Sequence, residues 1–187
     1  MGDGREIGVL PRSVLDAARK RDAAAFTAII RHYDSQLRGL VWRTLGSSEH
    51  MDDVMQDAAL RAFLALPSFQ ERSTLGTWLH RITYRACVDH LRRSGRRPEE
   101  DYDLDVADPR DLETEVGELM DLGRALATLP PQHRALVFLV YQVGFDYETA
   151  AHILDVPPGT ASSRLAAARM ALRAQLAPCV ESKGGAS

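Results

Sequence analysis

The stretch TLGTWLHRITYRACVDHLRRSGRR, residues 74–97, decides the fold. At 100° per residue it predicts a helix with apolar side chains on two opposite faces. Such a helix is held between neighbours, which indicates a packed helical domain. A narrow basic stripe lies between the two faces. Its arginines line up because residues 4 and 11 positions apart on a helix fall within about 40° of each other. The stripe consists of Arg81, Arg85 and Arg92, and Trp78 borders it.

Two interpretations of this basic stripe remain open from the residues alone. Arginines beside an aromatic ring suit a single-stranded nucleic acid, since the cations meet phosphates and the ring stacks on bases. The same pattern also fits a solvated helix face whose tryptophan belongs to the core.

The composition is that of a globular protein, with 187 residues, 45% hydrophobic and 26% charged. No apolar run is long enough to span a membrane, and the N-terminus lacks the apolar core of a secretory signal. Cys87 and Cys179 form no metal-ligating spacing and fit a reducing compartment. We therefore expect a cytoplasmic protein without membrane insertion.

The net charge of −3 hides an uneven distribution. Residues 98–118 hold ten of the 26 acidic residues and one of the 23 basic ones, so the remainder carries 22 basic against 16 acidic residues. Strand signals are nearly absent, and the abundant Ala, Leu and Arg favour helix. We predict an all-α fold of two small helical domains joined by a flexible acidic linker. The expected divisions are a mobile N-terminus (1–12), a first domain (13–97), the linker (98–116), a second domain (117–177) and a mobile tail (178–187).

Capping and breaking residues set the expected helix ends. Ser13, Ser48 and Thr74 are the expected N-caps, and Gly46 is an expected stop. The predicted helices span 13–20, 22–45, 48–66, 74–94, 115–128, 131–142, 147–154 and 160–177.

The segment FDYETAAHILDVPPGTASSRLAAARMALR, residues 145–173, predicts a helix-turn-helix. Its second helix directs the small Ser162 and Ser163 outward, and Arg164 and Arg169 lie beside them. Small side chains toward bases and arginines toward phosphates suit a helix in the major groove. A plain helical hairpin is the structural alternative.

Asp52, Asp53, Gln56 and Asp57 form an acidic and amide patch. It fits a metal site with His50, a solvated face or a protein-docking surface. Its spacing matches no closed set of ligands, so no metal and no cofactor are expected, while carboxylates beside Met and Val suit a mixed protein interface. No catalytic motif occurs, so we expect no enzyme.

Three segments resemble the ECF (extracytoplasmic function, group IV) sigma factors of the sigma-70 family: DDVMQDAALRAF, STLGTWLHRITYRACVDHLRRSGRR and LATLPPQHRALVFLVYQVGFDYETAAHILDVPPGTASSRLAAARMALR. The resemblance covers about residues 13–97 and 117–177. It implies two all-α domains, σ2 and σ4, in a factor that binds core RNA polymerase, recognises promoter −35 and −10 elements and melts DNA.

The resemblance also implies roles for individual residues. The residues expected to dock on the β′ clamp helices are Asp52, Asp53, Gln56 and Asp57. Contacts with −10 DNA fall to Phe69, Gln70, Arg72, Ser73, Thr74, Trp78, Arg81, Arg85 and Arg92. Contacts with −35 DNA fall to Thr160, Ser162, Ser163, Arg164 and Arg169, in a domain that also leans on the β flap. A separate anti-sigma factor is the expected regulator.

Four positions depart from the family pattern. Arg85 stands at a usual Asn, Ala59 at a usual Phe, Asp155 at a usual Gly and Ser162 at a usual Lys. Because the −35 helix then carries fewer cations, we expect weaker intrinsic DNA binding with a shallower salt dependence.

The alternative function is a stand-alone helix-turn-helix regulator that does not touch polymerase. It accounts for residues 145–177 but leaves the acidic patch and the tryptophan-bearing helix without a role. Such regulators usually dimerise, whereas no dimer helix is recognisable here, so a monomer is expected. A protein-binding helical scaffold without promoter activity is a third interpretation.

Overall fold

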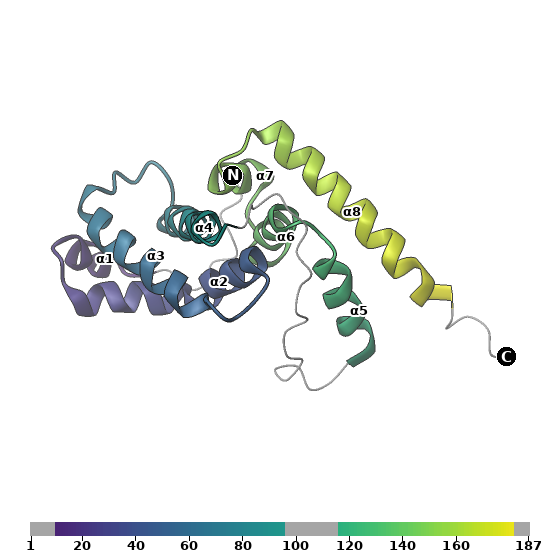
Figure 1. Ribbon diagram of the computed structural model, residues 1–187. Helices are drawn as coiled ribbons and strands as arrows, with labels where there is room; N and C mark the ends of the chain where they lie inside the picture. Colours follow the sequence, from purple (N-terminus) through teal and green to yellow (C-terminus); the bar gives the residue numbers. More distant parts are fainter. Residues whose placement is uncertain (1–9, 96–115, 182–187) are drawn as a thin grey trace.

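The computed structural model describes residues 10–95 and 116–181, and every regular element in these ranges is a helix (Figure 1). The all-α prediction is confirmed. The first range holds α1 (Arg12–Arg19), α2 (Ala23–Leu45), α3 (Met51–Ala65), the 3-10 turn η1 (Leu66–Ser68) and α4 (Leu75–Arg93). The second holds α5 (Val116–Ala127), α6 (Pro131–Val137), the π-helical segment η3 (Phe138–Val143), α7 (Tyr147–Leu154) and α8 (Pro158–Glu181). The expected mobile N-terminus, acidic linker and tail lie largely outside the described residues.

Several helix ends carry clear capping groups, and the ends at Gly46 and Thr74 are the ones predicted from the sequence. The side chain of Asp22 accepts a hydrogen bond from the backbone N–H of Ala25 at 2.9 Å and starts α2. Gly46 ends that helix with a left-handed φ of 77°. The hydroxyl of Thr74 accepts from the N–H of Thr77 at 3.1 Å and starts α4.

Other helix ends differ from the expectation. Ser13 lies inside α1, which begins at Arg12 after Pro11. Ser48 belongs to the turn before α3, because its carbonyl accepts from the N–H of Met51 at 3.1 Å. The last helix begins at Pro158, since proline is well suited to a first turn that needs no N–H donor.

A first hydrophobic core lies among α1, α2, α3 and the inner face of α4. It includes Ile29, Leu37, Val54, Leu79 and Leu91, each at most 2% exposed. Together with Leu66 of η1, these helices form the first half of the described structure.

A second core joins α6, η3, α7 and α8, and it also contains two residues of the first body. These are Leu40 of α2 and Tyr84 of α4, which pack with the buried Leu136, Leu139 and Leu154. Helix α4 therefore lies between α3 on one side and α7 on the other (Figure 1). The prediction that this helix is held between neighbours is confirmed, and its second neighbour comes from the distant half of the chain.

Close backbone contacts fix this junction. The guanidinium of Arg134, 1% exposed, donates from Nε to the carbonyl of Arg43 at 3.0 Å. The ring of Phe138 lies against Gly39 of α2, where a Cβ atom would stand 2.5 Å from the ring Cζ. Only a glycine at this position allows the ring to approach so closely.

Candidate nucleic-acid interface

The basic stripe of α4 faces the turn of the helix-turn-helix. One Nη atom of Arg81 donates to Asp155 Oδ1 at 3.1 Å, and Arg85 donates to Asp155 Oδ2 at 3.3 Å. The second Nη of Arg81 donates to Nε2 of His152 at 3.0 Å, which requires the unprotonated form of that nitrogen. Arg92, further along the same stripe, is exposed. The structure thus brings two predicted −10 residues against the predicted −35 reader.

Both the backbone conformation and the charge of Asp155 fit its position in the turn after α7, next to two arginines. It ends α7 in the left-handed region with a φ of 59°, a conformation that Asp tolerates better than most residues. The hydrogen bond from Arg85, followed by the charges of both arginines, lowers the pKa of Asp155 from its ordinary value of 3.8. The carboxylate is therefore ionised at neutral pH.

The loop between η1 and α4 is built around a buried ring. Phe69 is 8% exposed and packs on Trp78 with ring centroids 5.0 Å apart. Arg19 donates to the carbonyl of Phe69 at 2.6 Å and forms an ion pair with Glu71 at 2.6 Å. Glu71 adopts a left-handed backbone conformation with a φ of 55°. Phe69 and half-buried Trp78 hold the loop from inside.

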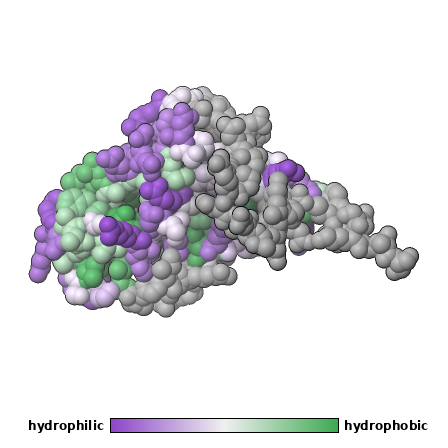
Figure 2. All heavy atoms as spheres, turned by 90° about the horizontal axis from the view of Figure 1, so that it is seen from below, coloured by the Kyte–Doolittle hydropathy of each residue, from purple (hydrophilic) through white to green (hydrophobic). Residues whose placement is uncertain are grey.

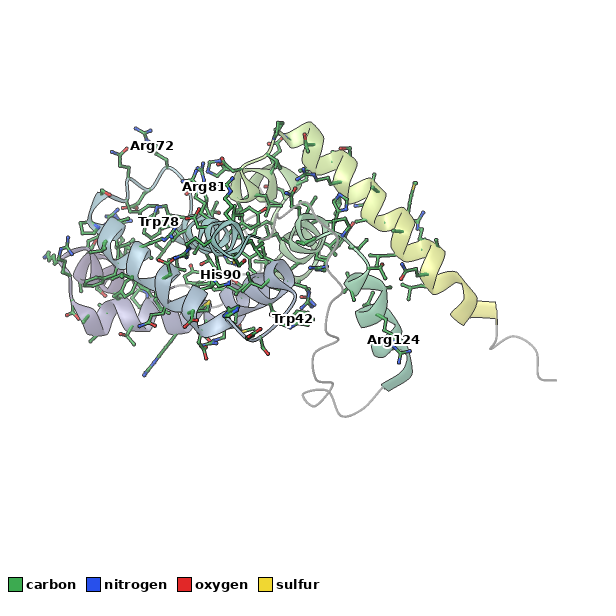
Figure 3. The ribbon with its side chains drawn as sticks, in the orientation of Figure 1. Trp42, Arg72, Trp78, Arg81, His90 and Arg124 are labelled. Carbon is green, nitrogen blue, oxygen red and sulfur yellow. The ribbon has the colours of Figure 1, made fainter. Side chains whose placement is uncertain are left out.

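The remaining predicted −10 residues of this loop point outward. Gln70 and Arg72 are exposed, and Figure 3 shows Arg72 projecting from the loop away from the helices. Ser73 is half-buried, and Thr74 is engaged as the N-cap of α4. Two donors, Gln70 and Arg72, are thus presented to solvent beside the stripe helix.

The second helix of the helix-turn-helix presents a smooth outer face. Ser162 and Ser163 are exposed, and the hydroxyl of Ser163 donates to the carbonyl of Thr160 at 3.0 Å. Ala161, Leu165 and Ala168 are buried on the opposite side, as the apolar stripe of the sequence predicts. The small exposed residues leave room for a base-pair edge to approach the backbone.

The two predicted −35 arginines are held differently. Arg169 hydrogen-bonds to the hydroxyl of Tyr141, and its guanidinium lies 5.6 Å from the centre of that ring. Arg164 is half-buried, and its Nη1 atom is buried without a hydrogen-bond partner. Arg164 therefore faces inward, toward α4, instead of lying with the exposed serines.

A cleft of about 740 Å³ opens beside the contact between α4 and the helix-turn-helix. It is basic, because four arginines line it with two aspartates. Its lining residues are Arg61, Tyr84, Arg85, Val88, Asp89, Arg92, Gln132, Leu154, Asp155, Val156 and Arg164. Residues predicted to contact the two DNA elements thus line one cleft.

The predicted docking patch divides into an exposed part and an engaged part. Asp52 is 87% exposed at its side chain and accepts from Arg38 at 2.7 Å, while Asp53 and Gln56 are exposed. Asp57 is 31% exposed and accepts from Arg61 at 2.8 Å. That arginine also binds Asp89 of α4. Asp57 therefore connects α3 with α4.

Sequence reasoning missed two exposed leucines on the same helix. Leu60 and Leu64 are 56% and 57% exposed and follow Gln56 at four-residue spacing, so the three side chains share one face of α3. This four-residue spacing in the sequence could have identified the shared face. Figure 2 shows hydrophobic surface gathered at the α1–α3 end of the molecule, interrupted by hydrophilic residues. Acidic and apolar groups side by side are typical of a protein interface.

Buried groups of α4 belong to the core. Burial raises the pKa of Tyr84 and of the Cys87 thiol to about 12 each, so both stay protonated at neutral pH. No group of three His, Cys, Asp or Glu that could hold a metal ion occurs among the described residues. In the same part of the chain, no helix is long and apolar enough to cross a membrane.

The two halves of the chain match two family models. Residues 29–97 match sigma-70 region 2, and residues 119–172 match sigma-70 region 4. The chain is 37% identical over 151 residues to the ECF RNA polymerase sigma factor SigM of Mycobacterium tuberculosis, covering 81% of this chain and 76% of that protein. It is 30% identical over 183 residues to the ECF RNA polymerase sigma-E factor of Escherichia coli, covering 89% and 94%.

Solved structures agree with these matches. The sigma factor RpoE in complex with the anti-sigma factor NepR from Bartonella quintana superposes with a TM-score of 0.68 and 27% identity, covering 81% of this chain and 96% of that one. CnrH in complex with the cytosolic domain of CnrY shares the fold, with a TM-score of 0.63 and 24% identity, covering 89% and 97%.

Proposed function

The chain belongs to the ECF family of RNA polymerase sigma factors, which direct transcription initiation, and from this membership we propose that it binds core RNA polymerase and opens promoter DNA. The observation that carries the proposal is the match of both halves to polymerase sigma regions, with four arginines lining the cleft between the two predicted DNA-reading elements. It acts by binding alone, without catalysis, metal or cofactor.

The decisive experiment is run-off transcription with purified core polymerase on a randomised promoter library. Transcripts that depend on the added chain and start downstream of a shared motif support the proposal. Core polymerase that starts no more often with the chain than without it contradicts the proposal.

Docking on polymerase uses the exposed part of α3. Asp52, Asp53 and Gln56 offer acceptors for a basic partner surface, and Leu60 and Leu64 supply apolar area beside them. Asp57 contributes through the position of α4, because its carboxylate is engaged with Arg61. The partner is the β′ clamp-helix surface expected from the family resemblance.

Melting of the −10 element uses the loop and the stripe. The exposed Gln70 and Arg72 capture an unstacked non-template base, with Ser73 and Thr74 at the loop base. Arg81, Arg85 and Arg92 bind phosphates of the same strand, and Phe69 and Trp78 support the loop from inside. Unstacking costs a few kcal/mol, and contacts of about 1–3 kcal/mol per base offset it.

Recognition of the −35 element uses the second helix of the helix-turn-helix. Thr160, Ser162 and Ser163 approach the major groove, and Arg164 and Arg169 contact phosphates or base edges. The same domain leans on the β flap. Because Ser162 carries no charge, this contact depends weakly on salt.

The remaining properties follow from family membership. We propose domains at 13–97 and 117–177, a monomer in the cytoplasm, and control by a separate anti-sigma factor, since the solved sigma factor RpoE is a complex with the anti-sigma factor NepR. A stand-alone regulator would match a family model at the helix-turn-helix alone, whereas residues 29–97 match as well. A stable dimer on a sizing column would favour that alternative.

A further inference from the structure

The loop between η1 and α4 is held by a helix that precedes the residues matching the first family model. Helix α1 ends at Arg19, whereas the match to sigma-70 region 2 begins at residue 29. The helix packs against η1, where the loop begins (Figure 1). Arg12 and Arg19, one at each end of α1, reach residues of the loop. Neither arginine has a part in the proposed polymerase docking or in the proposed DNA contacts.

Arg19 binds the loop at three points. One Nη atom donates to the carbonyl of Phe69 at 2.6 Å and lies 2.6 Å from a carboxylate oxygen of Glu71. Its guanidinium also lies 5.7 Å from the centre of the Phe69 ring, within the range of a cation–π contact. The side chain of Arg19 is only 23% exposed, so these contacts are weakened less by solvent than those of an open surface. Arg19 therefore fixes both the backbone and a side chain of the loop.

Glu71 is also bound by the second arginine. Arg12 donates to the two carboxylate oxygens of Glu71 at 2.5 and 2.8 Å, a bidentate arrangement that fixes the orientation of both groups. The hydrogen bond from Arg12 is the main cause that lowers the pKa of Glu71 from its ordinary value of 4.5, so this carboxylate is ionised at neutral pH. The left-handed backbone of Glu71, with a φ of 55°, is one that a glutamate rarely adopts without support from its surroundings.

These contacts determine which side chains of the loop face solvent. Phe69 is anchored by its ring on Trp78, and Glu71 is anchored by its carboxylate on α1. Gln70 lies between the two anchored residues and Arg72 follows them, and both are exposed. Figure 3 shows Arg72 projecting from the loop away from the helices. The anchored residues therefore set the direction of the two side chains that are proposed to capture a base.

We propose that α1 takes part in −10 recognition by holding this loop in place. Arg12, Arg19 and Glu71 are positioning residues and contact no DNA themselves. Because they hold the loop, Gln70 and Arg72 meet an unstacked base already ordered. Without them the loop has to be ordered on binding, which lowers the affinity, and a loose loop can also adapt to the wrong base. The inference rests on the proposed −10 role of the loop.

Two variants release the loop from opposite sides. Arg19→Gln removes the cation, and Glu71→Asn removes the carboxylate but keeps a residue that tolerates the left-handed region. The double variant should behave much like the stronger single one, because both changes act on one network. Arg19→Lys keeps the charge without the planar fork, so it should fall between Arg19→Gln and the unaltered chain. Asp16→Asn is the matched control, because it removes an exposed carboxylate paired with Arg12 at 3.6 Å and leaves the loop contacts in place.

The first readout is hydrogen–deuterium exchange of residues 69–74 in the isolated chain. The backbone N–H of Phe69 donates to the carbonyl of Leu66 at 3.0 Å, so its exchange reports opening of the loop. Exchange should be about 10-fold faster in Arg19→Gln and Glu71→Asn than in Asp16→Asn, as expected when charged hydrogen bonds are lost. Equal exchange rates overturn the positioning role. Urea unfolding followed by circular dichroism verifies that each variant is folded.

The second readout is base discrimination by the complex with core polymerase. Each complex is titrated with a single-stranded oligonucleotide that carries the −10 motif selected from the promoter library, and with versions changed at one base. The ratio of the two affinities measures discrimination, and a smaller folded fraction would not change that ratio. It should fall about 5-fold in Arg19→Gln and Glu71→Asn, since part of the contact to the correct base is lost, and stay unchanged in Asp16→Asn.

The outcomes separate this inference from the proposed function. Transcripts from the library with the unaltered chain, together with equal discrimination in all variants, overturn the inference alone, even where loop exchange is faster. An absence of transcripts with the unaltered chain contradicts the proposed function and overturns the inference with it. Faster exchange with lower discrimination in both variants, and neither change in Asp16→Asn, supports the role of α1.

Discussion

Lowering the pH should destabilise the protein through a single buried histidine, His80. Its side chain is fully buried between the two halves, and its Nδ1–H donates to the carbonyl of Gly76 at 2.7 Å. The Nε2 atom is buried without a hydrogen-bond partner, and the imidazole ring lies nearly perpendicular to the ring of Phe145, with centroids 5.1 Å apart. Burial lowers the pKa of His80 from its ordinary value of 6.5 to about 4, and the bond to Gly76 opposes that change only in part.

The sign of the effect follows from proton linkage. The pKa is lower in the folded chain, so between pH 6.5 and about 4 the unfolded chain binds the proton and the folded chain does not. The stabilisation is complete above pH 6.5 and is lost as the pH falls toward 4. At about 1.4 kcal/mol per pKa unit the full loss is about 3 kcal/mol, of which about 2 kcal/mol falls between pH 7 and pH 5.

Urea unfolding followed by circular dichroism at pH 7, 6 and 5 measures this loss. Carboxylates also titrate in this range, so the comparison is with His80→Gln, which cannot take up the proton. The variant should lose about 2 kcal/mol less than the unaltered chain between pH 7 and pH 5. Identical pH dependence in the two proteins would refute the assignment of a buried, neutral His80.

Three further outcomes are expected. Asp53→Ala should leave the free energy of unfolding within about 0.5 kcal/mol of the unaltered value, because the residue is exposed. The same variant should bind core polymerase more weakly in a titration, and an unchanged affinity argues against docking by α3. Arg85→Asn replaces a cation by an amide able to read a base edge, so run-off transcription on the library should show a changed −10 preference; an identical motif would place Arg85 away from the strand. Arg134→Met should lower the free energy of unfolding in urea by about 3 kcal/mol, because the carbonyls of Arg43 and Leu129 lose their hydrogen-bond donor. A decrease of less than about 0.5 kcal/mol would contradict this.

Local signals in the sequence were sufficient for much of the fold. Gly46 and Thr74 act within one helical turn, so their roles as helix stop and helix cap can be recognised without knowing the rest of the chain. The two apolar faces of residues 74–97 correctly indicated a helix between neighbours. The exposed Ser162 and Ser163 likewise follow from helical period alone.

Long-range contacts were not predictable in the same way. Hydrophobic periodicity tells which face of a helix is buried but not which element covers it, so the contact of Arg81 with Asp155, 74 positions away, left no signal. The burial of Phe69 and of Arg134 depends on partners from distant helices. The π-helical segment Phe138–Val143 also has no pattern that distinguishes it from an α-helix.

The close approach of Phe138 to Gly39 limits how freely halves of related proteins can be exchanged. A chimera that joins residues 10–95 to the second half of a relative keeps the hydrogen-bonded helices of each part. It places a foreign side chain against Gly39, leaving a void when that side chain is small. The reciprocal chimera places Phe138 against the side chain at position 39 of the relative. A Cβ atom there would lie 2.5 Å from the ring Cζ, which is too close. Positions 39 and 138 should therefore change together across homologous chains that share this packing, and exchanges that respect the pair should fold best.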